Sequence, residues 1–253
     1  MASLLETEAV VLSFTEVGEE DRIVTLLTRE TGLVRAGVSG ARSLKKGLTA
    51  SIDLFSRIAA ELSIPGKGGK LIRIRNARVI NPHLGIRSHY PATCASSYLA
   101  ELFSRSLAEM DPVPGTYEAL VDSFSALAAG EGLFRTVLVS ELLLLREQGI
   151  LPELNLCLSC GEKVEAGVLC PGMGGVLHER CAGSSEGFPL TGGDLANLRY
   201  FLVKGFSGGA RLSIREETAR ELHGKLHAHT VFQVGFEARS IPSLRNLRNG
   251  SGG

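Results

Sequence analysis

Residues 70–80, KLIRIRNARVI, decide how the first part of the chain is interpreted. Ile72 and Ile74 fall on one face of an extended strand and Arg73 and Arg75 on the other, because successive side chains of a strand point to opposite sides. Such alternation is typical of a strand with one buried face and one face in water. The stretch therefore predicts a sheet whose outer face is basic.

Four stretches upstream follow the same rules and complete a small all-β domain over residues 1–80. Each is a short apolar or alternating run bounded by glycine or proline turn signals. The runs and their expected inward residues are 8–14 with Val10, Leu12 and Phe14; 21–28, apolar almost throughout; 33–40 with Val34, Ala36 and Val38; and 53–63 with Leu54, Ile58 and Leu62. Five strands in this length predict an OB-fold barrel.

From about residue 90 the apolar period changes to that of a helix. Helices are predicted over residues 92–110, 116–129, 131–148, 191–204 and 214–236, with Thr191 as an N-cap. The expected organisation is an OB-fold domain over 1–80, a helical domain over 81–152 and 189–240, an insert over 153–188 and a flexible tail over 241–253. The fold class is therefore α+β and multidomain.

The insert contains two pairs of metal-binding residue types. Cys157 and Cys160 are separated by two residues, and His178 and Cys181 repeat that spacing further along. Two such pairs are typical of a zinc ribbon, because each tight turn can direct both of its side chains to one tetrahedral ion. Cys170 is an alternative third ligand. We prefer His178, because it restores the spacing to Cys181, and we expect a closed, structural zinc site.

Other chemistry-bearing residues give weaker indications. Cys94 is flanked by alanines and suggests a small core residue. His223 and His227 lie one helical turn apart and could share a metal, but a polar helix face is favoured because no acidic ligand accompanies them in a known pattern. Protease and hydrolase motifs are absent from the sequence, and no nucleophile, base and orienting group assemble. We therefore predict a protein that is not an enzyme.

The net charge is zero, with 27 basic and 27 acidic residues, but its distribution is uneven. Residues 1–80 carry +3, 79–198 carry −8 and 199–253 carry +5, and residues 35–78 alone carry +8. Such a segment creates a local field that the total hides. Phe55 is its only aromatic residue, which favours phosphate contacts over base stacking. The candidate DNA-binding residues are Arg35, Arg42, Lys45, Lys46, Arg57, Lys67, Lys70, Arg73 and Arg75.

Membrane and secreted classes are disfavoured. No apolar run approaches the roughly 20 residues of a membrane span, and the first residues carry acids where a secretory signal would carry basic groups. We expect a cytoplasmic protein whose cysteines are not a disulfide framework.

The order of barrel, helical domain and cysteine-bearing insert resembles that of the RecO family of DNA-repair recombination mediators. The stretches that carry the resemblance are 18–28, 31–33, 40–42, 98–102, 145–161 and 174–181, and the likeness extends over about residues 7–245. The sequence departs from the family at His178, where cysteine is usual.

The resemblance implies a non-enzymatic function in the bacterial cytoplasm, at the nucleoid. Family members bind single- and double-stranded DNA without sequence preference and anneal complementary strands. They act with RecR, and in some bacteria RecF, to load RecA onto DNA coated by single-stranded DNA-binding protein. They also bind the acidic C-terminal tail of that coating protein, for which the resemblance implies a groove on the helical domain; Arg135, Leu138 and Leu142 share a helical stripe and are our candidates for it.

Two other function classes remain open on the sequence. One is a protein-interaction adaptor, stabilised by zinc, whose basic barrel binds an acidic partner. The other is a zinc-dependent hydrolase, which requires an open position on the metal.

Overall fold

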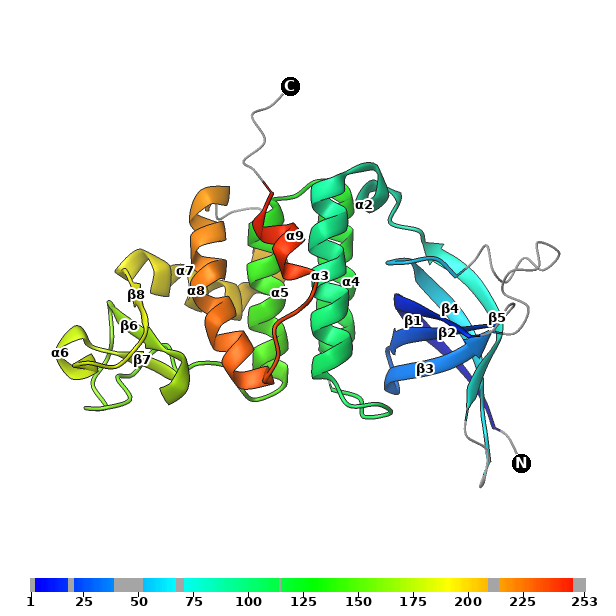
Figure 1. Ribbon diagram of the computed structural model, residues 1–253, viewed down its shortest axis with the longest axis horizontal. Coiled ribbons are helices and arrows are strands. Elements are labelled where there is room, and N and C mark those ends of the chain that lie inside the picture. Colours follow the sequence, from blue (N-terminus) through cyan, green and yellow to red (C-terminus); the bar gives the residue numbers. More distant parts are fainter. Residues whose placement is uncertain are drawn as a thin grey trace. The chain divides into compact units, whose positions relative to one another are not determined.

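The computed structural model describes residues 3–17, 21–38, 52–66, 71–113, 115–208 and 214–247. Contacts divide the chain into two compact units, one of Met1–Gly130 with Ala238–Gly253 and one of Glu131–Glu237 (Figure 1). We expected a single helical domain, whereas the contacts group the helices before Gly130 with the barrel. Among the described residues, no helix is both long enough and apolar enough to cross a membrane.

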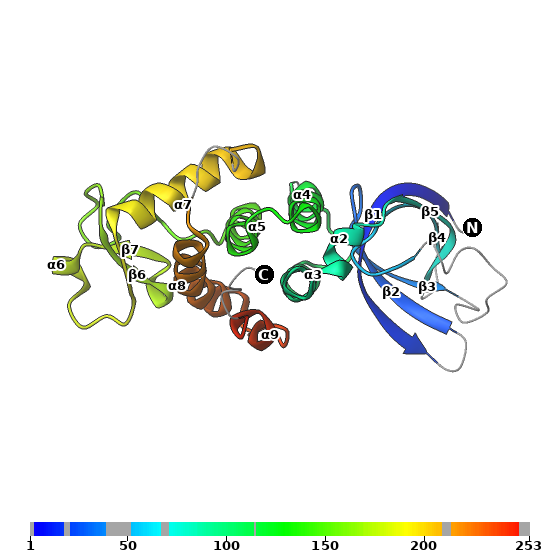
Figure 2. The same ribbon diagram turned by 90° about the horizontal axis from the view of Figure 1, so that it is seen from above.

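The first unit contains the predicted five-stranded OB-fold barrel. Its strands are β1 (Ser3–Val17), β2 (Asp21–Thr28), β3 (Gly32–Val38), β4 (Arg57–Ile64) and β5 (Ile72–Asn81). They close in the order β1-β2-β3-β5-β4, and Figure 2 shows the strands curving around a common centre. All neighbours are antiparallel except β3 and β5, which are parallel and pair at Ala36–Ile72 and Gly37–Arg73.

Most of the predicted inward residues line the barrel core. Val34, Ala36 and Val38 of β3 are buried there, as are Ile58 and Leu62 of β4. The fourth strand begins later than expected, because a turn before Arg57 includes Leu54, which is only half-buried.

β1 corrects one prediction. We expected Val10, Leu12 and Phe14 on one face, but a bulge between Val11 and Ser13 changes the register. Val11 and Phe14 contact the barrel core, whereas Val10 and Leu12 are buried outside that cluster. β1 also contacts α3 and α4, so both of its faces are covered. An inserted residue in a bulge reverses the alternation beyond it.

Four helices belong to the same unit: α2 (Leu84–Ser88), α3 (Tyr90–Ser106), α4 (Thr116–Ala129) and α9 (Ile241–Arg245). The predictions of α3 and α4 are confirmed, and Figure 2 looks along both helices. The two short helices were not predicted. The segment after α3 is tied to the barrel, because the backbone N–H of Met110 donates to the carbonyl of Leu33 over 2.9 Å.

The expected flexible tail is incorrect for residues 241–247. Ile241 and Leu244 of α9 are buried. Ahead of the helix, the Glu101 carboxylate accepts hydrogen bonds from the backbone N–H of Arg239 (2.8 Å) and of Ser240 (2.9 Å), and from the Ser240 hydroxyl (2.7 Å). Pro242 stands in the first turn of α9, a position that tolerates its missing N–H.

The second unit combines α5 (Leu133–Glu147), α7 (Gly192–Lys204) and α8 (Glu216–Val234) with a three-stranded sheet. The sheet strands are β6 (Gly167–Cys170), β7 (Gly175–Leu177) and β8 (Phe188–Leu190), in the order β7-β6-β8. Thr191 is the predicted N-cap of α7 and forms a capping box with Asp194. α5 contacts both α7 and α8.

The burial of α5 corrects the predicted partner groove. Leu138 and Leu142 are fully buried, because α5 packs between two helices and is apolar around most of its circumference. Arg135 is mostly buried and lies 3.7 Å from the Glu131 carboxylate. The two leucines therefore belong to the core of the second unit and do not line an exposed groove.

The packing of α2 against α4 predicts a strong effect at Gly85. A Cβ at this position would overlap the carbonyl oxygen of Ala128, which is held by the α4 backbone. We expect Gly85→Ala to lower the free energy of unfolding by about 1–3 kcal/mol, measured by urea denaturation. Gly224→Ala is the matched control: Gly224 lies inside α8 with open space around it, so alanine should stabilise by about 0.5–1 kcal/mol. Equal effects of the two changes would contradict this account.

Candidate metal centre and nucleic-acid interface

A tight turn presents the first pair of cysteines. The backbone N–H of Gly161 donates to the carbonyl of Cys157 over 2.8 Å, and Gly161 has a φ of 75°, which favours glycine. The N–H of Cys157 donates to the carbonyl of Glu162, also over 2.8 Å, and closes the turn. The sequence Cys-x-x-Cys-Gly thus forms a hairpin tip with both thiols on it.

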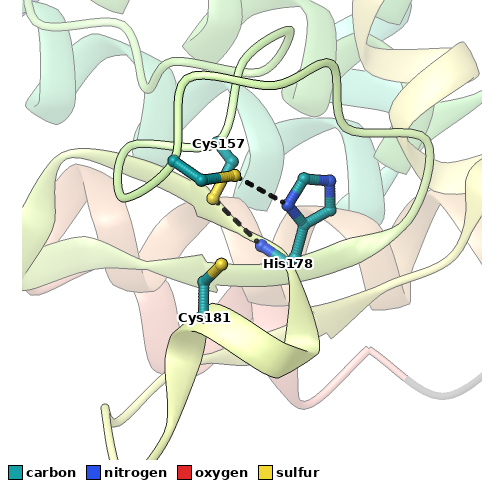
Figure 3. Close-up of side chains that lie close together, drawn as sticks. Cys157, His178 and Cys181 are labelled. Carbon is teal, nitrogen blue, oxygen red and sulfur yellow. Dashed lines mark hydrogen bonds between the residues drawn. The ribbon is translucent and has the colours of Figure 1, made fainter.

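The second pair lies where β7 meets α6 (Glu179–Ala182). His178 is the N-cap of this short helix, and the N–H of Cys181 donates to the His178 carbonyl over 2.8 Å. One helical turn therefore places both side chains on the same side. Figure 3 shows the backbone N–H of His178 directed at the sulfur of Cys157, with the sulfur of Cys181 nearby.

The ligand atoms of Cys157, Cys160, His178 and Cys181 all lie within 4.8 Å of one another. The Nδ1 atom of His178 is 3.4 Å from the Cys160 sulfur, while its Nε2 atom is 3.2 Å from the carbonyl oxygen of Lys163. A backbone carbonyl at Nε2 holds the proton there and leaves Nδ1 as the donor atom, as in many protein metal sites. The predicted set of three cysteines and one histidine is brought together.

Cys170 lies outside this cluster. Its sulfur is 3.7 Å from the carbonyl oxygen of Val168, on the strand β6, and burial raises the pKa of its thiol. Cys94 is likewise a buried core residue, on α3. Of the two candidates for third ligand, the geometry selects His178.

The electrostatics of the cluster suit a cation. Burial raises the pKa of Cys157, but N–H groups of Cys160, His178 and Ser159 outweigh this and lower it to about 6, which favours the thiolate. The pKa of Cys181 is raised, by burial first and then by its neighbours Cys157 and Cys160. Crowded thiols resist ionising together, and a metal ion removes that resistance. The donor set therefore fits zinc.

An arginine that the sequence did not single out holds the insert in place. Arg199 of α7 donates from Nε to the carbonyl of Leu154 over 3.0 Å and from Nη2 to the carbonyl of Val164 over 2.5 Å. These two residues flank the cysteine hairpin. No spacing pattern in the sequence connects Arg199 to carbonyls 35 and 45 residues away.

The described basic candidates of the barrel fall into two groups. Arg73 and Arg75 are exposed on β5, and Arg35 is exposed on β3, where it lies 3.0 Å from the Glu109 carboxylate. Gly37, the partner of Arg73 across the β3–β5 pair, presents no side chain between the strands. We call Arg35, Arg73 and Arg75 the seam surface. The other candidates, Arg42, Lys45, Lys46, Lys67 and Lys70, lie outside the described residues.

Arg57 belongs to a different environment. Its Nε donates to the Glu8 carboxylate over 3.2 Å, and the Tyr117 hydroxyl donates to the same carboxylate over 3.3 Å. The hydrogen bond from Arg57 lowers the pKa of Glu8, and burial raises the pKa of Tyr117 to about 12. Arg29 adds a contact of 3.7 Å to Glu8 and stacks over the Tyr117 ring. Arg57 therefore joins β4 to β1 and α4, and its charge is directed at Glu8.

A further arginine, Arg78, is exposed on β5 and was missed by simple alternation. A bulge opposite Glu61 and Leu62 shifts the register, so Ala77 turns inward and Arg78 outward. Arg78 lies in a groove with three carboxylates, those of Glu6, Glu8 and Glu61. In the sequence, the only sign of this shift is Ala77, which stands where simple alternation would continue the outward row of Arg73 and Arg75.

Comparison with known proteins agrees with this architecture. Residues 1–83 match the family model "Recombination protein O N terminal", and residues 87–240 match "Recombination protein O C terminal". The boundary between the two matches falls just after β5, where the barrel ends.

Curated relatives match over most of their length, and each is named "DNA repair protein RecO". The protein of Dehalococcoides mccartyi CBDB1 is 27% identical over 96% of both chains. Those of Anaeromyxobacter sp. strain K and Exiguobacterium sibiricum are each 31% identical; the alignments cover 89% and 96% of this chain and 90% and 97% of theirs. The OB-fold barrel, the cysteine-bearing insert and these matches along nearly the whole sequence lead to one conclusion: the chain belongs to the RecO family of DNA repair proteins.

Proposed function

We propose that the protein is a non-enzymatic recombination mediator of the bacterial cytoplasm that binds DNA without sequence preference and anneals complementary single strands. With RecR, and with RecF where it is present, it would help to load RecA onto DNA coated by single-stranded DNA-binding protein. The observation that carries the proposal is the seam surface of Arg35, Arg73 and Arg75 on the barrel of a RecO-family chain.

The position of the seam surface concentrates basic residues. β3 ends at Val38 and β5 begins at Ile72, and the pairing of Ala36 with Ile72 brings these two ends together. The five basic candidates outside the described residues lie in the sequence between Val38 and Ile72, with Arg42 following the end of β3 and Lys70 preceding the start of β5. Phosphates that approach the seam surface would therefore meet arginines from the part of the sequence with the highest positive charge.

Base stacking contributes little to this surface. Phe55, the aromatic residue of the basic segment, is buried and packs edge-on against Phe124 with ring centroids 5.4 Å apart. Contacts to phosphates alone lower the repulsion between two strands and leave their base edges available for pairing. Such a surface supports annealing better than an aromatic platform, which would hold the bases of a single strand.

The metal in this proposal is a structural zinc ion. Cys157, Cys160, His178 and Cys181 would hold it, and four protein donors fill a tetrahedral site and leave no position for a catalytic water. The ion would connect the cysteine hairpin to α6. The proposed partners also include the acidic C-terminal tail of single-stranded DNA-binding protein, at a surface other than the buried leucines of α5.

Neutralising the seam surface should weaken binding to every DNA sequence alike. For Arg73→Gln/Arg75→Gln we expect the slope of log K against log salt on single strands to fall in magnitude by about 1.4, since each lost phosphate contact removes about 0.7. Fluorescence anisotropy at several salt concentrations measures this slope.

Arg78→Gln is the matched control for the seam variant. Arg78 is an exposed arginine on the same strand, but the carboxylates beside it repel phosphate, so its loss should change the slope less. Loss of affinity for one DNA sequence only, or a slope near zero in the unmodified protein, would exclude phosphate-led binding.

Annealing of complementary strands precoated with single-stranded DNA-binding protein tests the mediator function. We expect the protein to accelerate annealing and Arg73→Gln/Arg75→Gln to reduce that acceleration. No acceleration, together with retained binding of an acidic protein partner, would favour the adaptor instead. Fluorescence energy transfer between labelled complementary strands, without nucleotide, measures the annealing rate.

The zinc assignment is tested by metal content. His178→Ala should lower zinc by one equivalent per chain, because an imidazole donor is lost. His178→Cys should retain zinc, because thiolate satisfies the same tetrahedral site. Cys170→Ser and Cys94→Ser should leave the content unchanged, as neither thiol lies in the cluster. A loss on Cys170→Ser but not on His178→Ala would reverse the ligand assignment. Elemental analysis of purified protein gives the answer.

A further inference from the structure

A carboxylate and two imidazoles meet in the core of the second unit. Glu141 of α5 is fully buried, and His223 and His227 lie one turn apart on α8 with exposed fractions of 3% and 2%. The sequence favoured a polar helix face for the two histidines, whereas α8 turns this face toward α5. All three donor atoms lie within 4.8 Å of one another.

The distances in this cluster are those of metal ligands. The Nε2 atom of His223 is 3.4 Å from Oε1 of Glu141, and the Nδ1 atom of His227 is 3.3 Å from the same oxygen. The His227 contact also satisfies hydrogen-bond geometry, although it is longer than the usual distance of about 2.9 Å. Zinc binds nitrogen and oxygen at about 2.0–2.1 Å, so two ligands of a tetrahedral ion are about 3.3 Å apart.

A carboxylate and an aromatic ring lie around the outside of the cluster. The Nε2 atom of His227, on the far side of its ring, lies 3.8 Å from Oε1 of Glu237, a half-exposed carboxylate of the same unit. This separation is too long for a direct hydrogen bond, so Glu237 contributes negative charge near the ring and does not fix its orientation. On the other side, the Phe134 ring lies 6.1 Å from the His223 ring and supplies an apolar wall.

The charge of Glu141 strengthens the case. The Glu141 carboxylate is fully buried and lies against both His223 and His227. A buried carboxylate requires a compensating positive charge. A divalent ion bound by the carboxylate and the two imidazoles would supply that charge.

We propose that Glu141, His223 and His227 form a second metal site, for a zinc-like divalent ion, separate from the cysteine cluster. Two imidazoles and one carboxylate are a common donor set for such ions. A water molecule or the second carboxylate oxygen would complete the coordination. The ion would connect α5 to α8 inside the core, and this function does not depend on DNA binding.

The full-length protein, loaded with zinc and dialysed, tests the proposal through metal content and X-ray absorption. We expect two equivalents of zinc per chain in the unmodified protein. Glu141→Gln, which keeps the shape of the side chain, should retain one equivalent with a sulfur-rich shell. Cys160→Ser should instead retain one equivalent bound by nitrogen and oxygen only. One equivalent in the unmodified protein, or two in Glu141→Gln, would overturn the second site.

His229→Asn is the matched control. His229 is a buried histidine on the same helix, but its Nε2 lies 3.0 Å from the carbonyl of Ile150, outside the cluster. The variant should keep two equivalents. If Glu141→Gln does not fold, the unmodified protein still decides: two sites give a shell with as many nitrogen and oxygen ligands as sulfur or more. A shell with one such ligand per three sulfurs is that of the cysteine cluster alone and would refute the proposal.

Discussion

The pairing of β1 with two neighbours is the constraint on which the first unit depends. β1 is fifteen residues long and pairs with β2 through its second half and with β4 through its first half. Without a strand of this length the five strands would leave two open edges, which exposed backbone groups make prone to aggregation. The bulge after Val11 allows the strand to bend around the barrel. The short parallel pairing of β3 with β5 completes the closed barrel, and the seam surface lies on these two strands.

In both units, carboxylates connect separate segments of the chain through hydrogen bonds and ion pairs. In the barrel, Glu8 gathers Arg29, Arg57 and the Tyr117 hydroxyl, and so joins strands to α4. Elsewhere, Glu101 binds the backbone ahead of α9, and the Glu153 carboxylate accepts hydrogen bonds from the N–H groups of Asn155 and Leu156 before the cysteine hairpin. Glu101 and Glu153 thus accept hydrogen bonds from backbone N–H groups where the chain leaves regular structure.

The sequence predicted elements better than it predicted faces. Strands and long helices follow from period and turn residues, so the barrel and α4 could be located closely. The bulges in β1 and β5 could not, because one inserted residue exchanges inside and outside without changing the composition. For that reason the faces of Val10 and Leu12 were misjudged and Arg78 was missed. α5 posed a different difficulty: a helix that is apolar nearly all round is buried on all sides, and a stripe through it does not mark a groove.

The sequence also predicted the metal centre only in part. Spacing identified four ligands and one rival, but only the fold, which brings His178 into the cluster and leaves Cys170 outside it, distinguishes the two. Glu141 meets His223 and His227 from 82 and 86 positions away, and no local pattern records such a contact. α9 likewise depends on Glu101, more than 130 residues earlier.

These contacts show how the acidic residues of the chain are used, and so why its uneven charge matters. The segment with charge −8 includes Glu101, Glu141 and Glu153, which are directed at backbone N–H groups or at imidazoles of their own unit. Asp194 caps α7 and binds Lys225 in the same way. Charges that are paired with groups of their own unit act only over short distances. At physiological salt, a field extends about 8 Å from its source. A phosphate that approaches the barrel therefore responds to the arginines of the seam surface and not to the net charge of zero.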